Sequence, residues 1–403
     1  MAAACRVAIV ADRKLRVIGS GFALVRWEQS RASAGCHSYP PAMLAEPLTL
    51  RAPAGEVRLT SNVLLAPIAG WCDLAWRETC RSLGGVGLAC TDLLSPKGLL
   101  CGSEASLDLA RTSDLDRPIC MQLYGSDPGI LGDGATWCAD HGATVVDINM
   151  GCPVDKVCKK DGGSKLMCDV AHALRLFEAV RERLPDNIPL TAKMRLGWDE
   201  PAYERGVASE LAIGLCELGA AMITVHGRTT EQRFRGTCRR EGIRRVVEDV
   251  GEATGGAVPV IGNGDIRTPD DCLAMLIETG CAGVMIGRGA FARPWMFREA
   301  WAAQRHAVGR PGAPAAEAEP TEPEKLDVVL AYFERMRAYR GDRYAMHKIR
   351  QKISWLGKGI RGGHCRPLKE GVRTAETPAD VHEAVERWRS REAVTAPSPI
   401  SAA

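Results

Sequence analysis

The sequence predicts an α/β protein made of a (β/α)8 barrel, the TIM-barrel class, followed by an all-helical C-terminal domain. Eight short apolar runs follow one another between residues 57 and 301, and segments with helical periodicity separate them. Strands that are apolar on both faces and alternate with helices favour a parallel sheet covered by helices. Eight such units within about 230 residues favour closure of that sheet into a barrel.

The apolar runs each end in a glycine or a polar residue, as expected of strands that open into the mouth of a barrel. They cover residues 63–66, 87–92, 119–125, 144–151, 190–197, 221–227, 258–264 and 283–289. The expected helices include residues 73–83, 128–141, 170–184, 202–218, 241–250 and 269–278. A doubly wound open sheet is the competing fold, but it would not need eight strands and its G-x-G-x-x-G signal is absent from this sequence.

Changes in composition mark the expected domains. Residues 1–46 are rich in Ala, Ser, Pro and Arg without a visible period, which predicts a disordered extension, or a start codon placed too early with Met43 as the true start. We expect the barrel over residues 47–305, a linker over 306–323, a helical domain over 324–392 and a disordered tail over 393–403.

Charge and cysteine content limit the classes of function. The 403 residues carry a net charge of only +3, so any nucleic-acid surface must arise from local clustering. The sixteen cysteines include no C-x₂-C pair and many lie in apolar runs, which favours free thiols in a reducing compartment. No apolar stretch reaches the length of a membrane span. We therefore expect a cytoplasmic protein, a monomer, without a metal site or a membrane partner.

A basic segment stands out in the expected helical domain. Between residues 331 and 361 it holds nine Lys or Arg against two acids, and five aromatic residues are interleaved. A basic helical face with aromatics suits an RNA backbone. A solvated helix face that packs its aromatics against the barrel explains the composition equally well.

Small and polar residues follow the apolar runs, at the end of the barrel where active sites lie. Lys193 and Arg195 share one face of their strand because side chains alternate along it. Gln122 can donate to and accept from the edge of a ring such as flavin, and Lys193 can stabilise an anionic reduced flavin. The loops after the last two strands, at residues 263–265 and 287–289, are where such barrels bind phosphate.

The most informative stretch is residues 147–153, Asp-Ile-Asn-Met-Gly-Cys-Pro, at the end of the fourth run. Pro153 fixes the chain directly after Cys152, so this thiol is expected on a fixed turn at the barrel mouth. A buried structural thiol is the alternative, and it is the expectation for most of the other cysteines. The polar neighbours Asp147 and Asn149 favour a functional thiol.

These motifs resemble the tRNA-dihydrouridine synthases in kind, order and spacing. The most specific are Asn-Met-Gly-Cys-Pro at residues 149–153 and His-Gly-Arg-Thr at residues 226–229. Further matching segments are residues 65–70, 122–125, 193–198, 262–266 and 285–289. The resemblance runs from about residue 57 to 301 and continues more weakly through residues 347–361.

The resemblance implies an FMN-binding barrel, a C-terminal tRNA-binding domain and NADPH, or NADH, as the reductant. It makes Cys152 the proton donor and places Asn149, Arg195 and Arg228 near the uracil or the flavin. The basic residues expected to bind tRNA are Arg350, Lys352 and Lys358. The implied FMN contacts are Pro67, Ile68, Ala69, Gln122, Lys193, His226, Asn263, Gly264, Asp265, Gly287 and Arg288.

Two departures from the family pattern lie in one loop. The family usually has Met where Ile68 stands and Thr where Cys72 stands, so Trp71 and Cys72 are expected to reshape one wall of the substrate mouth. Other readings stay open: another FMN barrel oxidoreductase acting on a free pyrimidine, similar to dihydroorotate dehydrogenase, or an RNA-binding protein on a degenerate barrel. The sequence does not specify which uridine of the D-loop would be reduced.

Overall fold

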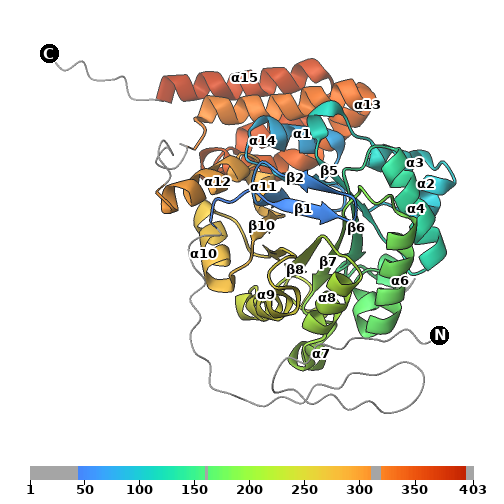
Figure 1. The fold of residues 1–403 in the computed structure, drawn as a ribbon. Coiled ribbons are helices and arrows are strands. Elements are labelled where there is room, and N and C mark those ends of the chain that lie inside the picture. The colour runs from blue at the N-terminus through green and yellow to red at the C-terminus, as the bar shows by residue number, and fades with distance from the viewer. Residues whose placement is uncertain (1–43, 159–161, 310–318, 396–403) are drawn as a thin grey trace, which may run out of the picture. The chain divides into compact units, whose positions relative to one another are not determined.

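The computed structural model describes residues 44–158, 162–309 and 319–395, which belong to one compact unit (Figure 1). The expected N-terminal extension therefore lies outside the described residues except for its last three, and the expected tail does so from residue 396 onward. Among the described residues, no helix is both long enough and apolar enough to cross a membrane.

Eight parallel strands form a closed barrel, which confirms the predicted fold class. Each strand pairs with its neighbour along the chain, and the last strand pairs with the first. The strands are β3 (Val63–Leu65), β4 (Leu88–Cys90), β5 (Ile119–Leu123), β6 (Val145–Met150), β7 (Leu190–Arg195), β8 (Met222–His226), β9 (Val260–Asn263) and β10 (Gly283–Ile286).

Helices surround the barrel (Figure 1). The main ones are α1 (Leu74–Ser82), α4 (Pro128–Asp140), α6 (Val170–Arg183), α8 (Val207–Glu217), α9 (Arg240–Thr254) and α10 (Pro269–Thr279). Shorter ones are α2 (Pro96–Leu100), α3 (Glu104–Ala110), α5 (Asp155–Cys158), α7 (Glu200–Arg205), α11 (Gly289–Ala292) and α12 (Met296–Ala307). The helix expected over residues 202–218 is two helices, α7 and α8, because Gly206 between them adopts a left-handed conformation with φ of 79°.

An antiparallel hairpin, which the sequence did not predict, covers the barrel end at which the strands begin. It consists of β1 (Thr49–Ala52) and β2 (Gly55–Arg58). Its buried Leu50 and the flanking Leu48 pack with Leu64, Leu88 and other inward-facing residues from the first halves of the strands. Among the described residues, this end of the barrel interior is filled by apolar packing, which favours ligand entry from the other end.

The interior becomes polar toward the ends of the strands. Three neighbouring strands carry Asn149, Lys193 and Thr224 at one level, since these residues are paired in register. The next level holds Arg195 and His226, which are paired in the same way. The polar half of the barrel thus faces the open mouth, as the predicted site requires.

The C-terminal region is helical and packs against the barrel. It consists of α13 (Glu322–Gly359), α14 (Arg366–Thr374) and α15 (Pro378–Thr395). Helix α13 packs on α1 and α11, and Gly341 interrupts it with φ of 75° and ψ of 169°. Helix α12 ends at Ala307, two residues inside the expected linker, and residues 310–318 of that linker lie outside the described residues.

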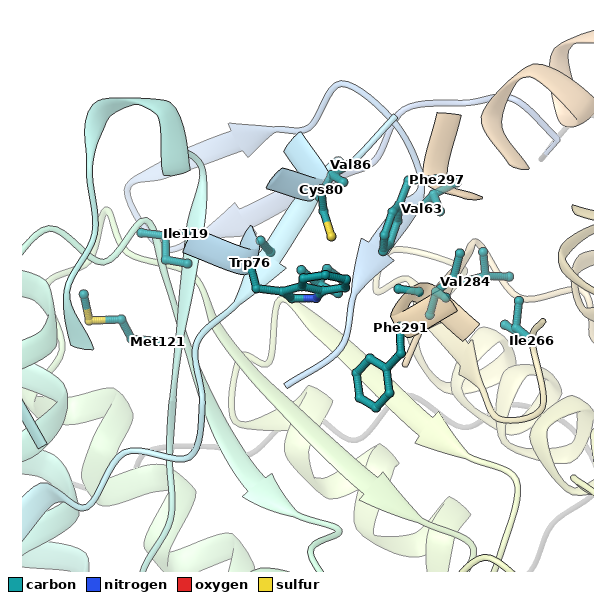
Figure 2. Close-up of a cluster of buried hydrophobic side chains, with 14 of the residues drawn as sticks. Val63, Trp76, Cys80, Val86, Ile119, Met121, Ile266, Val284, Phe291 and Phe297 are labelled. Carbon is teal, nitrogen blue, oxygen red and sulfur yellow. The ribbon is translucent and has the colours of Figure 1, made fainter. Parts of the chain in front are cut away.

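One hydrophobic cluster joins the barrel wall, its helices and the C-terminal region. Figure 2 shows part of it, where Trp76 and Cys80 of α1 lie among Val63, Val284 and Phe297. All fourteen described cysteines are free thiols.

Candidate active site

Cys152 lies on a turn that Asn149 holds at the end of β6. The Oδ1 atom of Asn149 accepts hydrogen bonds from the backbone N–H groups of Gly151, at 3.2 Å, and Cys152, at 2.9 Å. Burial raises the pKa of the partly exposed Cys152 thiol, with the neighbouring Cys158 adding to the effect. A thiol with a raised pKa stays protonated at neutral pH and can donate a proton.

A chain of side-chain hydrogen bonds sets the orientation of Asn149. Its Nδ2 donates to Oε1 of Gln122 at 2.8 Å, and Nε2 of Gln122 donates to Oδ2 of Asp147 at 2.7 Å. Thr191 donates to the other oxygen of Asp147 at 2.6 Å. Because an ionised carboxylate can only accept, Asp147 fixes the amide of Gln122, and Gln122 fixes that of Asn149. The oxygen of Asn149 is thereby left to hold the Cys152 turn.

Asp147 is buried, and burial raises its pKa to about 6 against the opposing effect of its bonds to Thr191 and Gln122. At pH 7 the carboxylate is therefore still ionised and able to accept both bonds. Sequence reasoning treated Asp147 only as a polar neighbour and missed Thr191. The alternation of side chains along a strand could have indicated Thr191, because it lies two residues before Lys193 on the same face of β7.

Lys193 is a cation inside the barrel for which the described residues provide no hydrogen-bond acceptor. Burial lowers its pKa to about 8, and the nearby Arg195 contributes in the same direction. The side-chain oxygen of Thr224, its register partner, is also buried and has no partner among the described residues. Lys193 is partly buried, and a cation withdrawn from water without an acceptor is costly unless a ligand compensates it. This part of the interior therefore fits an electron-rich ring such as a flavin.

Arg195 and Arg228 bind the loops around the mouth. Arg195 donates to the carbonyls of Gly151 at 2.8 Å, Thr229 at 2.8 Å and Arg233 at 3.0 Å. The first of these bonds fixes the residue before Cys152. Three acceptors likewise hold Arg228: the carbonyls of residues 235 and 236 and the carboxylate of residue 265. The expectation that both guanidinium groups lie near the uracil or the flavin stays a prediction.

The strand-end residues His226, Asn263 and Asp265 are well ordered by the fold. Burial and the surrounding cations, Lys193 first among them, hold the pKa of His226 well below its ordinary value, so its imidazole is neutral at pH 7. Nδ2 of Asn263 donates to the carbonyl of Met285 at 2.7 Å. Oδ2 of Asp265 accepts from Arg228 and from a backbone N–H. Its other oxygen, Oδ1, is buried without a partner among the described residues, so this oxygen and the backbone are the parts of Asp265 available to a cofactor.

The loops after β9 and β10 are suited to a phosphate group. Asp265 has φ of 49°, and in the described part of the chain the N–H groups of Asp265, Gly287 and Arg288 have no acceptor. A Cβ atom on Gly287 would lie 3.2 Å from Cδ1 of Ile68, so this glycine permits a close approach of two loops. The guanidinium of Arg288 is exposed and lies 4.7 Å from the ring of Phe234. Free N–H groups beside a cation are typical of a phosphate site.

Cys72 orders the loop after β3 that carries Pro67, Ile68 and Ala69. Its thiol donates to the carbonyl of Ala66 at 3.0 Å and accepts the N–H of Ile68 at 3.3 Å. A threonine hydroxyl could make the same two bonds. Cys72 is fully buried, so it cannot reshape the substrate mouth, contrary to the expectation from the sequence.

The three basic residues expected to bind tRNA lie in different surroundings. Lys358 is exposed, and its ammonium lies 3.5 Å from the ring centre of Trp355. Arg350 is partly buried and donates to the carbonyl of Ala375 at 2.5 Å. Lys352 is only 2% exposed and bonds to barrel residues, so it has no solvent-facing donor for a phosphate. Lys352 is therefore not placed to contact RNA.

Sequence reasoning also missed Phe234, an aromatic side chain at the mouth that is 56% exposed. The guanidinium of Arg195 lies 5.8 Å from its ring centre, and His226 lies 6.5 Å from it. No sequence signal separated this phenylalanine from those of the core, because only its exposure in the fold does so.

The thiol of Cys152, the ammonium of Lys193 and backbone N–H groups without acceptors among the described residues lie at the open end of a closed parallel barrel, the end at which enzymes of this fold bind their substrates. The protein is an oxidoreductase. The chain belongs to the dihydrouridine synthase family, whose model matches residues 64–392. Membership of this family indicates a flavin cofactor.

Relatives from several bacteria are similar over most of their length. A probable tRNA-dihydrouridine synthase of Rhizobium leguminosarum is 33% identical over 80% of this chain and 93% of its own. The tRNA-dihydrouridine synthase B of Xanthomonas axonopodis is 33% identical over 80% and 91%. A probable tRNA-dihydrouridine synthase of Mycobacterium tuberculosis is 36% identical over 77% and 78%. A solved 2-naphthoyl-CoA reductase complex has a TM-score of 0.49 at 12% identity, over 68% of this chain and 53% of that chain.

Proposed function

We propose that this protein is an FMN-dependent tRNA-dihydrouridine synthase in which Cys152 is the proton donor. It reduces the C5–C6 double bond of a uridine in the D-loop of tRNA to 5,6-dihydrouridine, with NADPH or NADH as the electron source. The reaction class follows from the family. One observation supports the residue assignment. The ammonium of Lys193 on β7 has no hydrogen-bond acceptor among the described residues, and the thiol of Cys152 is presented at the end of β6, the neighbouring strand.

Several polar groups at the mouth then have a defined task. Bound FMN, once reduced, supplies the hydride that uracil receives at C6. Lys193 holds a positive charge beside the ring that becomes anionic on reduction. Cys152 delivers a proton from its Sγ atom to C5 of the uracil, acting as a general acid. Asn149 holds the turn that aims this thiol, and the loops after β9 and β10 bind the phosphate of the cofactor.

The RNA must deliver a base that is normally stacked within a folded loop. The target uridine has to leave its stack to reach the interior of the barrel, as in other enzymes that act on a base. Exposed cations of α13 hold the tRNA by its phosphates during this step. These cations are Lys358 and the partly exposed Lys348. Burial raises the pKa of Asp92 beside the barrel mouth, and Lys348 lies close enough to oppose this shift in part.

Replacing the thiol tests the assignment. Cys152→Ala should bind FMN as the wild type does and should reduce tRNA at least about a hundredfold more slowly, because general acids contribute about 10²–10⁴-fold. Dihydrouridine in the tRNA product is measured directly, and FMN affinity is measured by quenching of flavin fluorescence. Cys101→Ala, which removes an exposed free thiol, is the control and should retain full activity.

Normal dihydrouridine formation by Cys152→Ala would remove this thiol from the mechanism. The same assay, run with free uracil and dihydroorotate in place of tRNA, tests for a reductase of free pyrimidines. Reduction of the free bases at rates comparable to tRNA would replace the proposed substrate. Comparing kcat/KM for NADPH and NADH identifies the reductant.

A further inference from the structure

The ammonium of Lys352 is enclosed by other side chains at the interface between α13 and the barrel. Its Nζ atom donates to Oδ2 of Asp73 at 2.7 Å and to the carbonyl of Trp71 at 3.0 Å. The same atom lies 4.9 Å from the ring centre of Trp71, 5.3 Å from that of Trp76 and 4.6 Å from that of Tyr332. This cation is thus held by one carboxylate, one carbonyl and three aromatic faces, and it is withdrawn from the solvent-exposed surface.

Asp73 connects Lys352 to the start of α1. One carboxylate oxygen, Oδ1, caps this helix by accepting the N–H of Trp76 at 2.9 Å, and the other oxygen accepts Lys352. Helix α1 follows directly after residues 66–73, which we call the flavin loop because they include Pro67, Ile68 and Ala69. Lys352 therefore fixes the point at which the flavin loop enters a helix.

Both halves of α13 reach this point. Tyr332 precedes the break at Gly341 and Lys352 follows it, yet both side chains approach Oδ2 of Asp73. In a straight helix their Cα atoms would be about 30 Å apart. The break at Gly341 therefore lets residues from both halves of α13 bind the same carboxylate.

Aromatic stacking connects the flavin loop to the loop after β10, which carries the expected phosphate contacts. Trp71 stacks on Phe291 with ring centres 3.6 Å apart and an interplanar angle of 15°. Phe291 belongs to α11, directly after the expected phosphate contacts Gly287 and Arg288. Trp355 of α13 packs edge-on against both rings, at 6.4 and 5.6 Å. Figure 2 shows Phe291 below Trp76, and the two rings pack edge-on.

We infer that Lys352 is a positioning residue through which the C-terminal helical region sets the flavin loop for cofactor binding. The inference rests on the proposed function, since it assumes that FMN contacts residues 67–69. A loop that is already held in place does not have to be ordered when the ligand binds, which strengthens binding. The helical region thus has a second task besides RNA binding: it completes the flavin site of the barrel.

The variant Lys352→Met tests this inference in the full-length chain. Methionine keeps an unbranched apolar side chain among the aromatic rings but removes the charge and both hydrogen bonds. We expect the dissociation constant of FMN to rise about tenfold, since hydrogen bonds to charged groups contribute on this scale. The affinity for tRNA and the KM for tRNA should stay within about twofold, and excess FMN should restore kcat.

Arg366→Met is the matched control, because it removes a cation of the same region whose ion pair, with Glu370, is local and exposed. It should leave FMN affinity unchanged. Thermal unfolding with and without FMN separates a general loss of stability from weaker cofactor binding.

Two results would overturn the inference. One is weaker tRNA binding by Lys352→Met with unchanged FMN affinity, which would make Lys352 an RNA contact. The other is an unchanged affinity for both ligands. If Lys352→Met does not fold, Asp73→Asn removes the same ion pair and keeps the cap of Trp76; normal FMN affinity of that variant would also overturn the inference. FMN binding is measured without RNA, so failure of the uridine substrate would appear separately, in the Cys152 assay.

Discussion

Lys193 carries a charge for which the described residues provide no hydrogen-bond acceptor. Burial lowers its pKa to about 8, whereas a lysine in the unfolded chain titrates near 10.4. At pH 7 the side chain is charged in both states, so folding must desolvate an ammonium without full compensation. A group that lowers stability and is nonetheless present is typical of a site that awaits a ligand.

Lys193→Met should therefore stabilise the flavin-free protein at pH 7, by on the order of 1 kcal/mol. The sign follows from linkage: between pH 8 and about 10.4 the unfolded chain binds the proton that the folded protein has lost, so wild-type stability rises with pH in that range. The advantage of Lys193→Met should shrink accordingly between pH 7 and pH 10. Urea unfolding at the two pH values measures it, with exposed Lys97→Met as the control. A Lys193→Met variant that is less stable than the wild type at pH 7 would contradict the desolvation argument.

The flavin loop shows how one side chain orders a whole element. The thiol of Cys72 donates to the carbonyl of the buried Ala66 and accepts the N–H of the partly buried Ile68, so removing it takes one hydrogen bond from each of these backbone groups. Cys72→Ala should lower the free energy of unfolding by about 1–3 kcal/mol, the cost of unpaired buried polar groups, and should weaken FMN binding. Cys72→Thr should stay close to the wild type in both measurements, because a hydroxyl restores both bonds. Equal behaviour of the two variants would show that the thiol acts only by filling space.

The elements that sequence reasoning could predict are those with local signals. Fully buried parallel strands appear as short apolar runs separated by segments of helical periodicity, so all eight barrel strands were recognisable. The β1–β2 hairpin was not, because its four-residue strands alternate too briefly for a period to be visible. The Gly206 break needed knowledge of a backbone conformation that no neighbouring residue specifies.

The same distinction applies to the residues of the site: those with a local signal were recognisable from the sequence, and those brought together by the fold were not. Cys152 was recognisable because Pro153 and the strand end are adjacent to it in sequence. The bonds from Gln122 through Asp147 to Thr191 were not, because residues from three strands meet only after the sheet register is fixed. The burial of Lys352, which the sequence predicted as an RNA-binding residue, could not be predicted for a related reason. A lysine is normally exposed, and its partner Asp73 is almost three hundred residues away in the sequence.

At the scale of the whole molecule, RNA binding must depend on where the cations lie, because the net charge is only +3. Lys348 and Lys358 belong to the same helix as the buried Lys352 but have solvent-accessible side chains. Lys348 lies near Asp92, whose carboxylate accepts the N–H of Gly70 in the flavin loop at 2.5 Å. A tRNA held by this lysine would therefore lie beside the barrel mouth.

The salt dependence of tRNA binding tests this arrangement. Each phosphate contact that is lost should reduce the slope of log K against log[salt] by about 1, so Lys348→Ala and Lys358→Ala should each do so, and the double variant by about 2. NADPH oxidation without tRNA should not change, because neither side chain is expected to contact the flavin. Arg387→Ala, whose exposed cation pairs with Glu383 on α15, serves as the control for net charge. A slope that falls equally in the control would mean that tRNA responds to total charge, whereas a slope that stays at the wild-type value in the double variant would move the RNA-binding surface away from α13.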